Sequence, residues 1–209
     1  MVNTSATSET ETRILEAATR IFRAKGRDGA KMQDIADEAG INKALLHYYF
    51  RSKDKLFEQV FRDSAAIFFS RLNEILQADL ELFTKIRRLC DAYITMTMEN
   101  PFIPIFIIGE VNRNAESFIT NIFSGKGIKP EFKSLEKQIA EEIRSGRIIP
   151  VRAEELLMNI LSLCIFPVIA KPMMQHNMKL SDKEFNRIMD DRKKTIPAMI
   201  IDSIKKKNT

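Results

Sequence analysis

The chain has 209 residues, a formal net charge of +5 and 44% hydrophobic residues, which is enough apolar material for a folded core and excludes wholesale disorder. This length allows one domain or two small ones. Only seven glycines and seven prolines punctuate the chain, and this favours long helices over many short strands. We therefore expect an all-α protein.

Cysteine usage and the N-terminus bear on the compartment. Cys90 and Cys164 are far apart in the chain and lie among apolar residues, so we expect reduced, buried thiols rather than a disulfide. The N-terminal residues lack the basic start and apolar core of a signal peptide. The longest apolar stretch, residues 156–170, is interrupted by polar residues and a proline and is too short for a membrane span. These features predict a cytoplasmic protein without a membrane partner.

The first helix is expected to begin at a capping box formed by Ser8 and Glu11. Apolar residues then recur at helical spacing, and Gly26 is the predicted stop. This helix would close a three-helix head with two short helices that follow it.

Residues 32–49 have the pattern of a helix-turn-helix. A short helix is predicted over residues 32–39, and Gly40 suits a left-handed turn because it has no Cβ. Asn42 is the predicted N-cap of a second short helix that ends near Tyr49. In a helix-turn-helix the second helix enters the major groove of DNA. Its candidate contact residues are Lys43, Ala44, Leu45, His47, Tyr48 and Tyr49.

An ordinary helical corner, with its aromatic residues in the core, is the alternative interpretation of this stretch. Net charge does not decide between the two, because residues 1–60 hold ten Lys and Arg against nine Asp and Glu. The argument for DNA rests on where the cations gather, which is around the turn and the second helix. The cluster consists of Arg27, Lys31, Lys43, Lys53 and Lys55.

Residues 11–61 resemble the N-terminal domain of the TetR family of transcriptional regulators, most specifically from Ala39 to Lys53. The resemblance implies a homodimer that binds DNA and whose C-terminal helices bind a small molecule. Two positions depart from the family pattern, Ala44, where Gly is frequent, and His47, where Tyr is frequent, and these departures concern the operator sequence. With Lys31 from the basic cluster, the implied DNA contacts are Met32, Gln33, Asn42, Lys43, Ala44, Leu45, His47, Tyr48, Tyr49 and Lys53.

The predicted domain boundary separates a DNA-binding domain, residues 8–52, from a larger helical domain, residues 53–207. Ser52 is the expected cap of a helix that runs to about Leu76 and links the two domains. The apolar run 102–108 is predicted to be a short buried helix. Residues 124–127 are predicted to be a connector and His176 is placed in a polar loop. Further helices are predicted over residues 79–100, 131–145 and 152–171, and after Ser181, which has Glu184 at capping-box spacing.

The second domain supplies candidates for two interfaces. Apolar and flexible side chains with few polar groups suit a ligand pocket, although the same residues are also what a plain core needs. The candidate pocket residues are Tyr93, Met96, Phe102, Phe106, Glu110, Met158 and Phe166. The resemblance places dimerisation on the last two predicted helices, which are rich in apolar residues. The candidate dimer residues are Leu157, Ile160, Leu161, Ile188, Ile196 and Ile200.

Catalytic and metal chemistry find little support in the sequence. The only histidines are His47 and His176, and neither has a cysteine or carboxylate at metal-ligand spacing. The sequence contains no nucleophile-elbow, zinc-protease or dinucleotide-binding motif. We therefore expect no enzyme, metal or cofactor. The expected function is a regulator, a repressor by preference, that binds a palindromic operator as a homodimer and is released by a small, largely apolar effector; the alternative is a helical binding module without DNA-binding activity.

Overall fold

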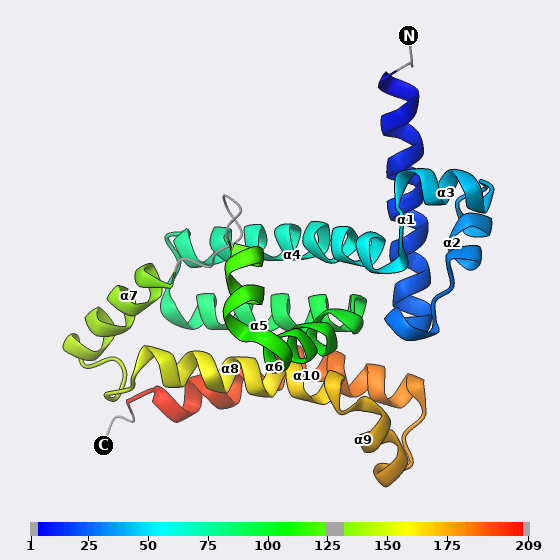
Figure 1. Ribbon diagram of the computed structural model, residues 1–209. Helices are drawn as coiled ribbons and strands as arrows, with labels where there is room; N and C mark the ends of the chain where they lie inside the picture. Colours follow the sequence, from blue (N-terminus) through cyan, green and yellow to red (C-terminus); the bar gives the residue numbers. More distant parts are fainter. Residues whose placement is uncertain (1–3, 124–131, 207–209) are drawn as a thin grey trace. The chain divides into compact units, whose positions relative to one another are not determined.

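Helices account for nearly all of the described chain. The computed structural model describes residues 4–123 and 132–206, and these form ten helices with a single isolated bridge between Ile148 and Lys205. The helices group into two compact units, Met1–Ile67 and Phe68–Thr209 (Figure 1). The all-α prediction is confirmed.

Unit 1 contains α1 (Thr4–Gly29), α2 (Met32–Glu38) and α3 (Lys43–Tyr49), together with the first part of α4 (Lys53–Gln77). Phe22 of α1 and Phe57 of α4 are fully buried and meet edge to face, with ring centroids 4.9 Å apart. Such a contact between large aromatic rings adds to the free energy gained by burial. The remaining fully buried residues include Ile14, Ala17, Ala18, Ile35, Ala36, Leu46 and Leu56.

One detail of α1 differs from the sequence prediction. The helix begins at Thr4, so Ser8 lies inside it and is not its N-cap. Gly26 interrupts the helical geometry as predicted, with φ 68° and ψ 175°, and a short helical segment follows it to Gly29. A residue without a Cβ tolerates this positive φ, so the long helix stops and the chain kinks at Gly26.

Helix α4 is the element shared by both units. Its N-terminus is capped as predicted, because the Ser52 hydroxyl accepts a hydrogen bond from the Lys55 amide at 3.2 Å. Residues 53–67 of the helix belong to unit 1 and residues 68–77 to unit 2. The compact units thus divide within α4, and the functional boundary expected at residues 52 and 53 stays a prediction.

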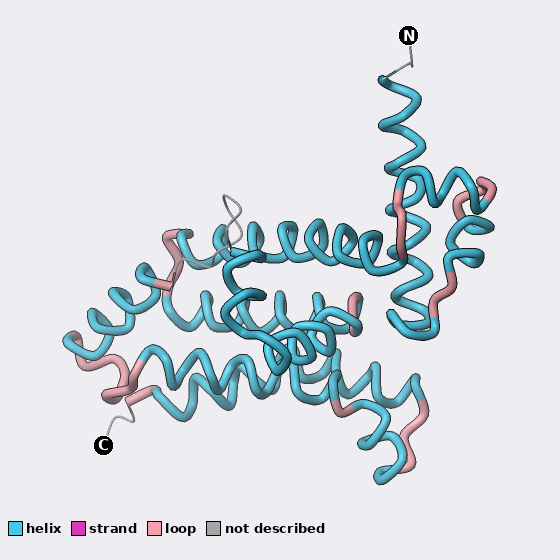
Figure 2. Tube along the Cα trace, in the orientation of Figure 1, coloured by secondary structure: helices cyan, strands magenta, loops and turns pink. Residues whose placement is uncertain are grey.

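Unit 2 is built around α5 (Leu82–Glu99). This helix packs against α8 (Ala153–Ile169) and α10 (Asp182–Ile204), and these two also contact each other. The other helices are α6 (Phe102–Phe123), α7 (Lys133–Arg144) and α9 (Lys171–Met178) (Figure 2). The α10 capping box is present as predicted, with the Ser181 amide donating to Glu184 at 2.8 Å.

Unit 2 corrects two sequence predictions. The apolar run 102–108 is the start of a helix of 22 residues, and Ile105 and Ile108 are exposed rather than buried. His176 lies on α9 and not in a loop, and its side chain is solvent-exposed. Pro172 occupies an early position of α9, where a proline is compatible with a helix start. The connector expected at residues 124–127 lies outside the described residues.

The C-terminal end of α4 is held by side chains from two other helices of unit 2. The buried Lys85 of α5 donates its Nζ to the Leu76 carbonyl oxygen at 2.9 Å, and the Ser134 hydroxyl of α7 donates to the same oxygen at 2.7 Å. Desolvation lowers the pKa of Lys85, since burial disfavours its charged form. These bonds satisfy a carbonyl that a helix end would otherwise leave unpaired.

In the described ranges, no single helix is both long and apolar enough to cross a membrane. Helices α8 and α9 reach that length and composition only as a pair, and they are bent by 68° relative to each other.

Candidate DNA-binding surface and effector unit

The turn between α2 and α3 has the geometry that its residues predict. Gly40 adopts φ 65°, and the Ile41 amide donates back to the Ala36 carbonyl oxygen at 3.0 Å, closing α2. The Asn42 side-chain oxygen accepts a hydrogen bond from the Leu45 amide at 2.7 Å, so Asn42 is the N-cap of α3. The start and direction of α3 are therefore fixed by local bonds.

Helix α3 is a short helix with almost all of its side chains outside the core. Leu46 is its only buried residue, and Tyr48 is 78% exposed. Tyr48 and Tyr49 meet edge to face at 5.5 Å, with Tyr49 half-buried. Because an exposed phenol and imidazole can donate to base edges or phosphates, this face has the chemistry that groove recognition requires. The exposed residues are Lys43, Ala44, Leu45, His47 and Tyr48.

Two further predicted contact residues, Lys53 and Gln33, form hydrogen bonds within unit 1. The Lys53 Nζ donates to the carbonyl oxygens of Asp28 and Ala30, at 3.3 and 3.2 Å. The Gln33 amide donates to the Asp37 carboxylate at 2.7 Å, and both lie at the surface of α2. Lys53 thus ties the start of α4 to the end of α1, a role that sequence spacing does not reveal.

Lys31 and Met32 stand at the start of α2. The Lys31 backbone amide donates to the Asp34 carboxylate at 3.3 Å, and that carboxylate also pairs with Lys25 at 2.7 Å. The hydrogen bond from Lys25 holds the pKa of Asp34 below its usual range. The Lys31 side chain is exposed and Met32 is half-buried.

The residues predicted to line an apolar pocket divide by exposure. Tyr93 and Phe102 are buried, and Met96, Phe106 and Glu110 are half-buried. Met158 and Phe166 are 60% and 53% exposed on α8. Glu110 forms an ion pair with the exposed Arg113 at 3.0 Å, so its carboxylate already has a partner on its own helix.

Tyr93 lies in the core of unit 2 near both cysteines. Its ring meets Phe68 edge to face at 5.2 Å, and burial raises the pKa of its phenol. Cys90 of α5 and Cys164 of α8 are free and buried. A hydrogen bond between these thiols, together with burial, raises the pKa of Cys164. Cys164 is therefore a poor nucleophile, because its reactive thiolate is disfavoured.

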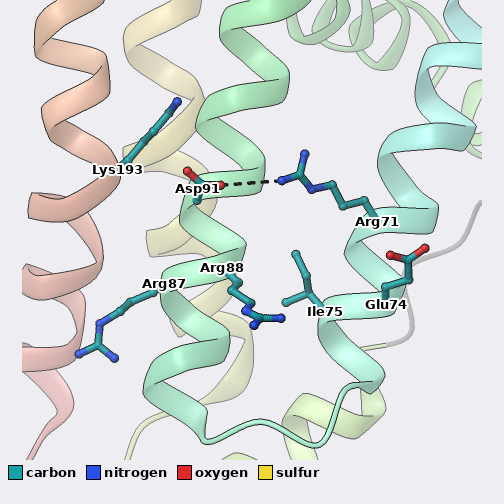
Figure 3. A pocket seen from close by; sticks show the side chains of 7 residues that line it. All are labelled: Arg71, Glu74, Ile75, Arg87, Arg88, Asp91 and Lys193. Atoms are coloured by element: carbon teal, nitrogen blue, oxygen red, sulfur yellow. Dashed lines mark ion pairs between the residues drawn. The ribbon is translucent and has the colours of Figure 1, made fainter.

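Unit 2 also contains a cavity of about 560 Å³ that is lined mainly by charged residues and by none of the predicted pocket residues (Figure 3). Residues of α4, α5 and α10 converge on it, and since they are far apart in the chain no sequence spacing indicates their proximity. The lining residues are Arg71, Glu74, Ile75, Arg87, Arg88, Asp91 and Lys193.

The predicted dimer residues divide into buried, half-buried and exposed side chains. Ile160, Ile196 and Ile200 are buried in the protomer's own core, where they pack within unit 2. Leu157 and Leu161 are half-buried against that core, and Ile188 is exposed. The apolar side chains of these helices that reach solvent most fully are Met158, Phe166 and Met199.

A metal site requires a cluster of ligating side chains. Residues 4–123 and 132–206 contain no group of three or more His, Cys, Asp or Glu side chains that could hold a metal ion.

Comparison with known proteins identifies the head. The profile of the "Bacterial regulatory proteins, tetR family" matches residues 14–60. The negative transcriptional regulator IcaR of the icaADBC biofilm operon of Staphylococcus aureus is 30% identical over 142 residues, covering 65% of this chain and 70% of IcaR. The nucleoid occlusion factor SlmA of Aliivibrio fischeri is 27% identical over 140 residues, and the match spans 65% of its length.

Solved structures share the fold over nearly the whole chain. A TetR transcription regulator from Haloarcula marismortui has a TM-score of 0.65 at 19% identity, covering 95% of this chain and 100% of that one. FadR from Bacillus subtilis, solved in complex with stearoyl-CoA, has a TM-score of 0.60 at 16% identity, covering 92% and 98%. Proteins of this family are transcriptional regulators and not enzymes. The chain belongs to the TetR family of transcriptional regulators, and α2 and α3 are its DNA-binding helix-turn-helix.

Proposed function

We propose that this protein is a ligand-responsive repressor that binds a near-palindromic operator as a homodimer and leaves it when unit 2 binds a small effector. The observation that carries the proposal is α3, a helix fixed by the Asn42 cap with Lys43, His47 and Tyr48 exposed and able to enter a major groove. Lys43 supplies a phosphate contact, and Leu45 and His47 supply contacts to bases.

Two relatives support the regulatory part of the proposal. IcaR is by name a negative regulator, which supports repression. FadR holds stearoyl-CoA, which supports a small-molecule effector bound by the larger unit. Effector binding changes operator affinity only if the two protein shapes involved differ in affinity for the effector.

The operator test uses fluorescence anisotropy with tiled DNA fragments from upstream of the protein's own gene. The wild type should select one fragment that contains an inverted repeat. Tyr48→Ala and Lys43→Ala should bind that fragment more weakly, whereas Lys133→Ala, an exposed charge on α7, should bind normally. Folded variants of α3 that keep full affinity would contradict the role proposed for this helix. A wild type that selects no fragment would favour a helical binding module that does not use DNA.

The dimer part of the proposal rests on α8 and α10, which expose apolar side chains that a partner copy can cover. Wild-type protein should be a dimer by light scattering. Phe166→Glu with Met199→Glu should yield monomers, because a buried unpaired carboxylate costs several kcal/mol. Ile105→Glu, an exposed apolar site on α6, is the control and should remain dimeric. Such a dimer should bind operator half-sites about 34–36 Å apart or a multiple of that. A monomeric wild type at micromolar concentration would refute both the assembly and this spacing.

A further inference from the structure

We propose that the cavity between α4, α5 and α10 is a binding site for a small multivalent anion that carries phosphate or carboxylate groups. The cavity volume of about 560 Å³ is within the range of small-molecule sites. Its lining is not the apolar one expected for the effector, because Ile75 is its only apolar side chain. The ligand that fits must therefore be recognised mainly through charge.

Cations outnumber carboxylates around the cavity. Four of its seven lining residues are cationic, Arg71, Arg87, Arg88 and Lys193, and only Glu74 and Asp91 are acidic. Because like charges gathered around one cavity repel each other, this arrangement favours an anion between them. Guanidinium groups are suited to the task, since their planar donors bind phosphate or carboxylate oxygens in pairs.

The internal ion pairs of the cavity are weak or incomplete. Arg71 and Asp91 approach to only 3.9 Å, and both side chains are about half exposed. Such an exposed pair contributes little free energy, so an incoming anion can replace Asp91 as the partner of Arg71. Lys193 pairs with Asp190, which does not line the cavity, at 3.2 Å. Arg87 and Arg88 have no ion-pair partner in the part of the chain that the structure describes.

The positions of the cations indicate more than one anionic group on the ligand. Arg88 extends from α5 toward α4, on the side of Arg71, whereas Arg87 extends toward α10 (Figure 3). A ligand with two or more separated charges can contact both sides of α5, and a single small anion cannot. We therefore assign the site to dianions and larger, and not to chloride or acetate.

This inference rests on the proposed function in one respect: if the protein is a ligand-responsive repressor, the anion is the chemical class of its effector. Binding itself can be tested on the full-length protein without DNA. Isothermal titration calorimetry with pyrophosphate and, separately, citrate measures this binding. A salt concentration of about 0.15 M NaCl screens nonspecific electrostatic attraction. We expect the wild type to bind at least one probe with a Kd below about 1 mM.

Variants locate the site. Arg71→Gln and Arg88→Gln should each weaken binding about tenfold or more, because each removes charge-assisted hydrogen bonds. The matched control is Arg144→Gln, which removes the same charge from an exposed site on α7 and should bind normally. All of these side chains reach solvent, so the variants should fold. Failure of the wild type to bind either probe, or equal weakening by Arg144→Gln, would overturn the proposal.

The two probes also separate the possible sources of the anion. Tighter binding of pyrophosphate identifies a polyphosphate, such as the diphosphate of a nucleotide or coenzyme, and tighter binding of citrate identifies a polycarboxylate. The preferred probe is then added to the anisotropy assay. Anion binding without any operator binding would contradict the repressor proposal and support the anion site. Operator binding without anion binding would support the repressor proposal and contradict the anion site.

Discussion

Helices α3 and α5 differ in how many of their side chains are buried. Helix α3 has seven residues, and one of them, Leu46, is buried. Helix α5 has eighteen residues and buries nine, among them Lys85 and Thr97. The first is attached to its unit by a single buried apolar residue and local bonds, while the second is the centre of a core. The difference indicates that most side chains of α3 can be changed without loss of the fold, whereas half of those on α5 belong to the core.

The largest effect should come from truncating the buried helix. Ile86→Ala removes a side chain with no exposed surface from α5 and should lower the free energy of unfolding by about 2–5 kcal/mol. Leu45→Ala on α3, where Leu45 is 37% exposed, should change it by less than about 0.5 kcal/mol and should alter operator preference. Urea denaturation followed by circular dichroism measures both. Similar decreases in stability at the two sites would erase the contrast between the helices.

A second comparison separates two lysines within unit 1. Lys43 lies exposed at the start of α3, and the Lys53 ammonium is bound to two backbone carbonyls. Lys43→Ala should reduce the slope of log Kobs against log salt by about 0.9 for each phosphate that it no longer neutralises, without changing stability. Lys53→Ala should also cost about 1 kcal/mol of unfolding free energy. Anisotropy titrations across a range of salt concentrations, with parallel urea melts, would show whether both lysines act only on DNA.

Removing the N-caps of two helices should have smaller effects on stability, of similar size in the two units. Asn42 caps α3 in unit 1, and Ser181 caps α10 in unit 2. Asn42→Ala and Ser181→Ala should each lower the unfolding free energy by about 1 kcal/mol. Only Asn42→Ala should also weaken operator binding, since it alone loosens the DNA-contacting helix. Operator affinity reduced equally by Ser181→Ala would show that α10 influences the head.

The smallest expected effect concerns pH. Hydrogen bonds from the Ser181 hydroxyl and amide lower the pKa of Glu184. A carboxyl whose pKa is depressed by folding stabilises the protein above its unfolded pKa, and this contribution is lost as pH falls through the folded value. The Tm difference between wild type and Glu184→Gln should therefore be present above about pH 5 and shrink toward about pH 3. A difference that is constant over this range would exclude the carboxylate as its cause.

Sequence spacing anticipates the features that a few neighbouring residues determine. The Gly40 turn and the caps at Asn42, Ser52 and Ser181 all appear where they are expected, because each depends on bonds between residues at most five positions apart. Family resemblance adds the identity of the helix-turn-helix, which spacing alone leaves open.

Features that depend on contacts between residues far apart in the chain cannot be predicted from sequence spacing. An apolar run such as 102–108 does not say which of its side chains meets a partner, so it does not predict the exposure of Ile105 on the long α6. Ile160 looks like a surface residue on an apolar helix, yet other parts of unit 2 cover it completely. The charged cavity brings Arg71 and Lys193 to one site from distant parts of the chain, and no local pattern encodes that proximity.

The hydrogen bonds to the Leu76 carbonyl hold the C-terminal end of α4 in place, so the helix can act as a rigid arm. Lys85 and Ser134 hold the carbonyl at one end, while the other end begins at Lys53. At 1.5 Å per residue, the 25 residues of α4 form an arm about 37 Å long. A rotation of about 5° at the held end therefore displaces the far end by about 3 Å, comparable to the rise of one base pair of DNA. The displacement grows with the length of the helix, so the effector response proposed above requires only a rearrangement of atomic dimensions beside Arg71.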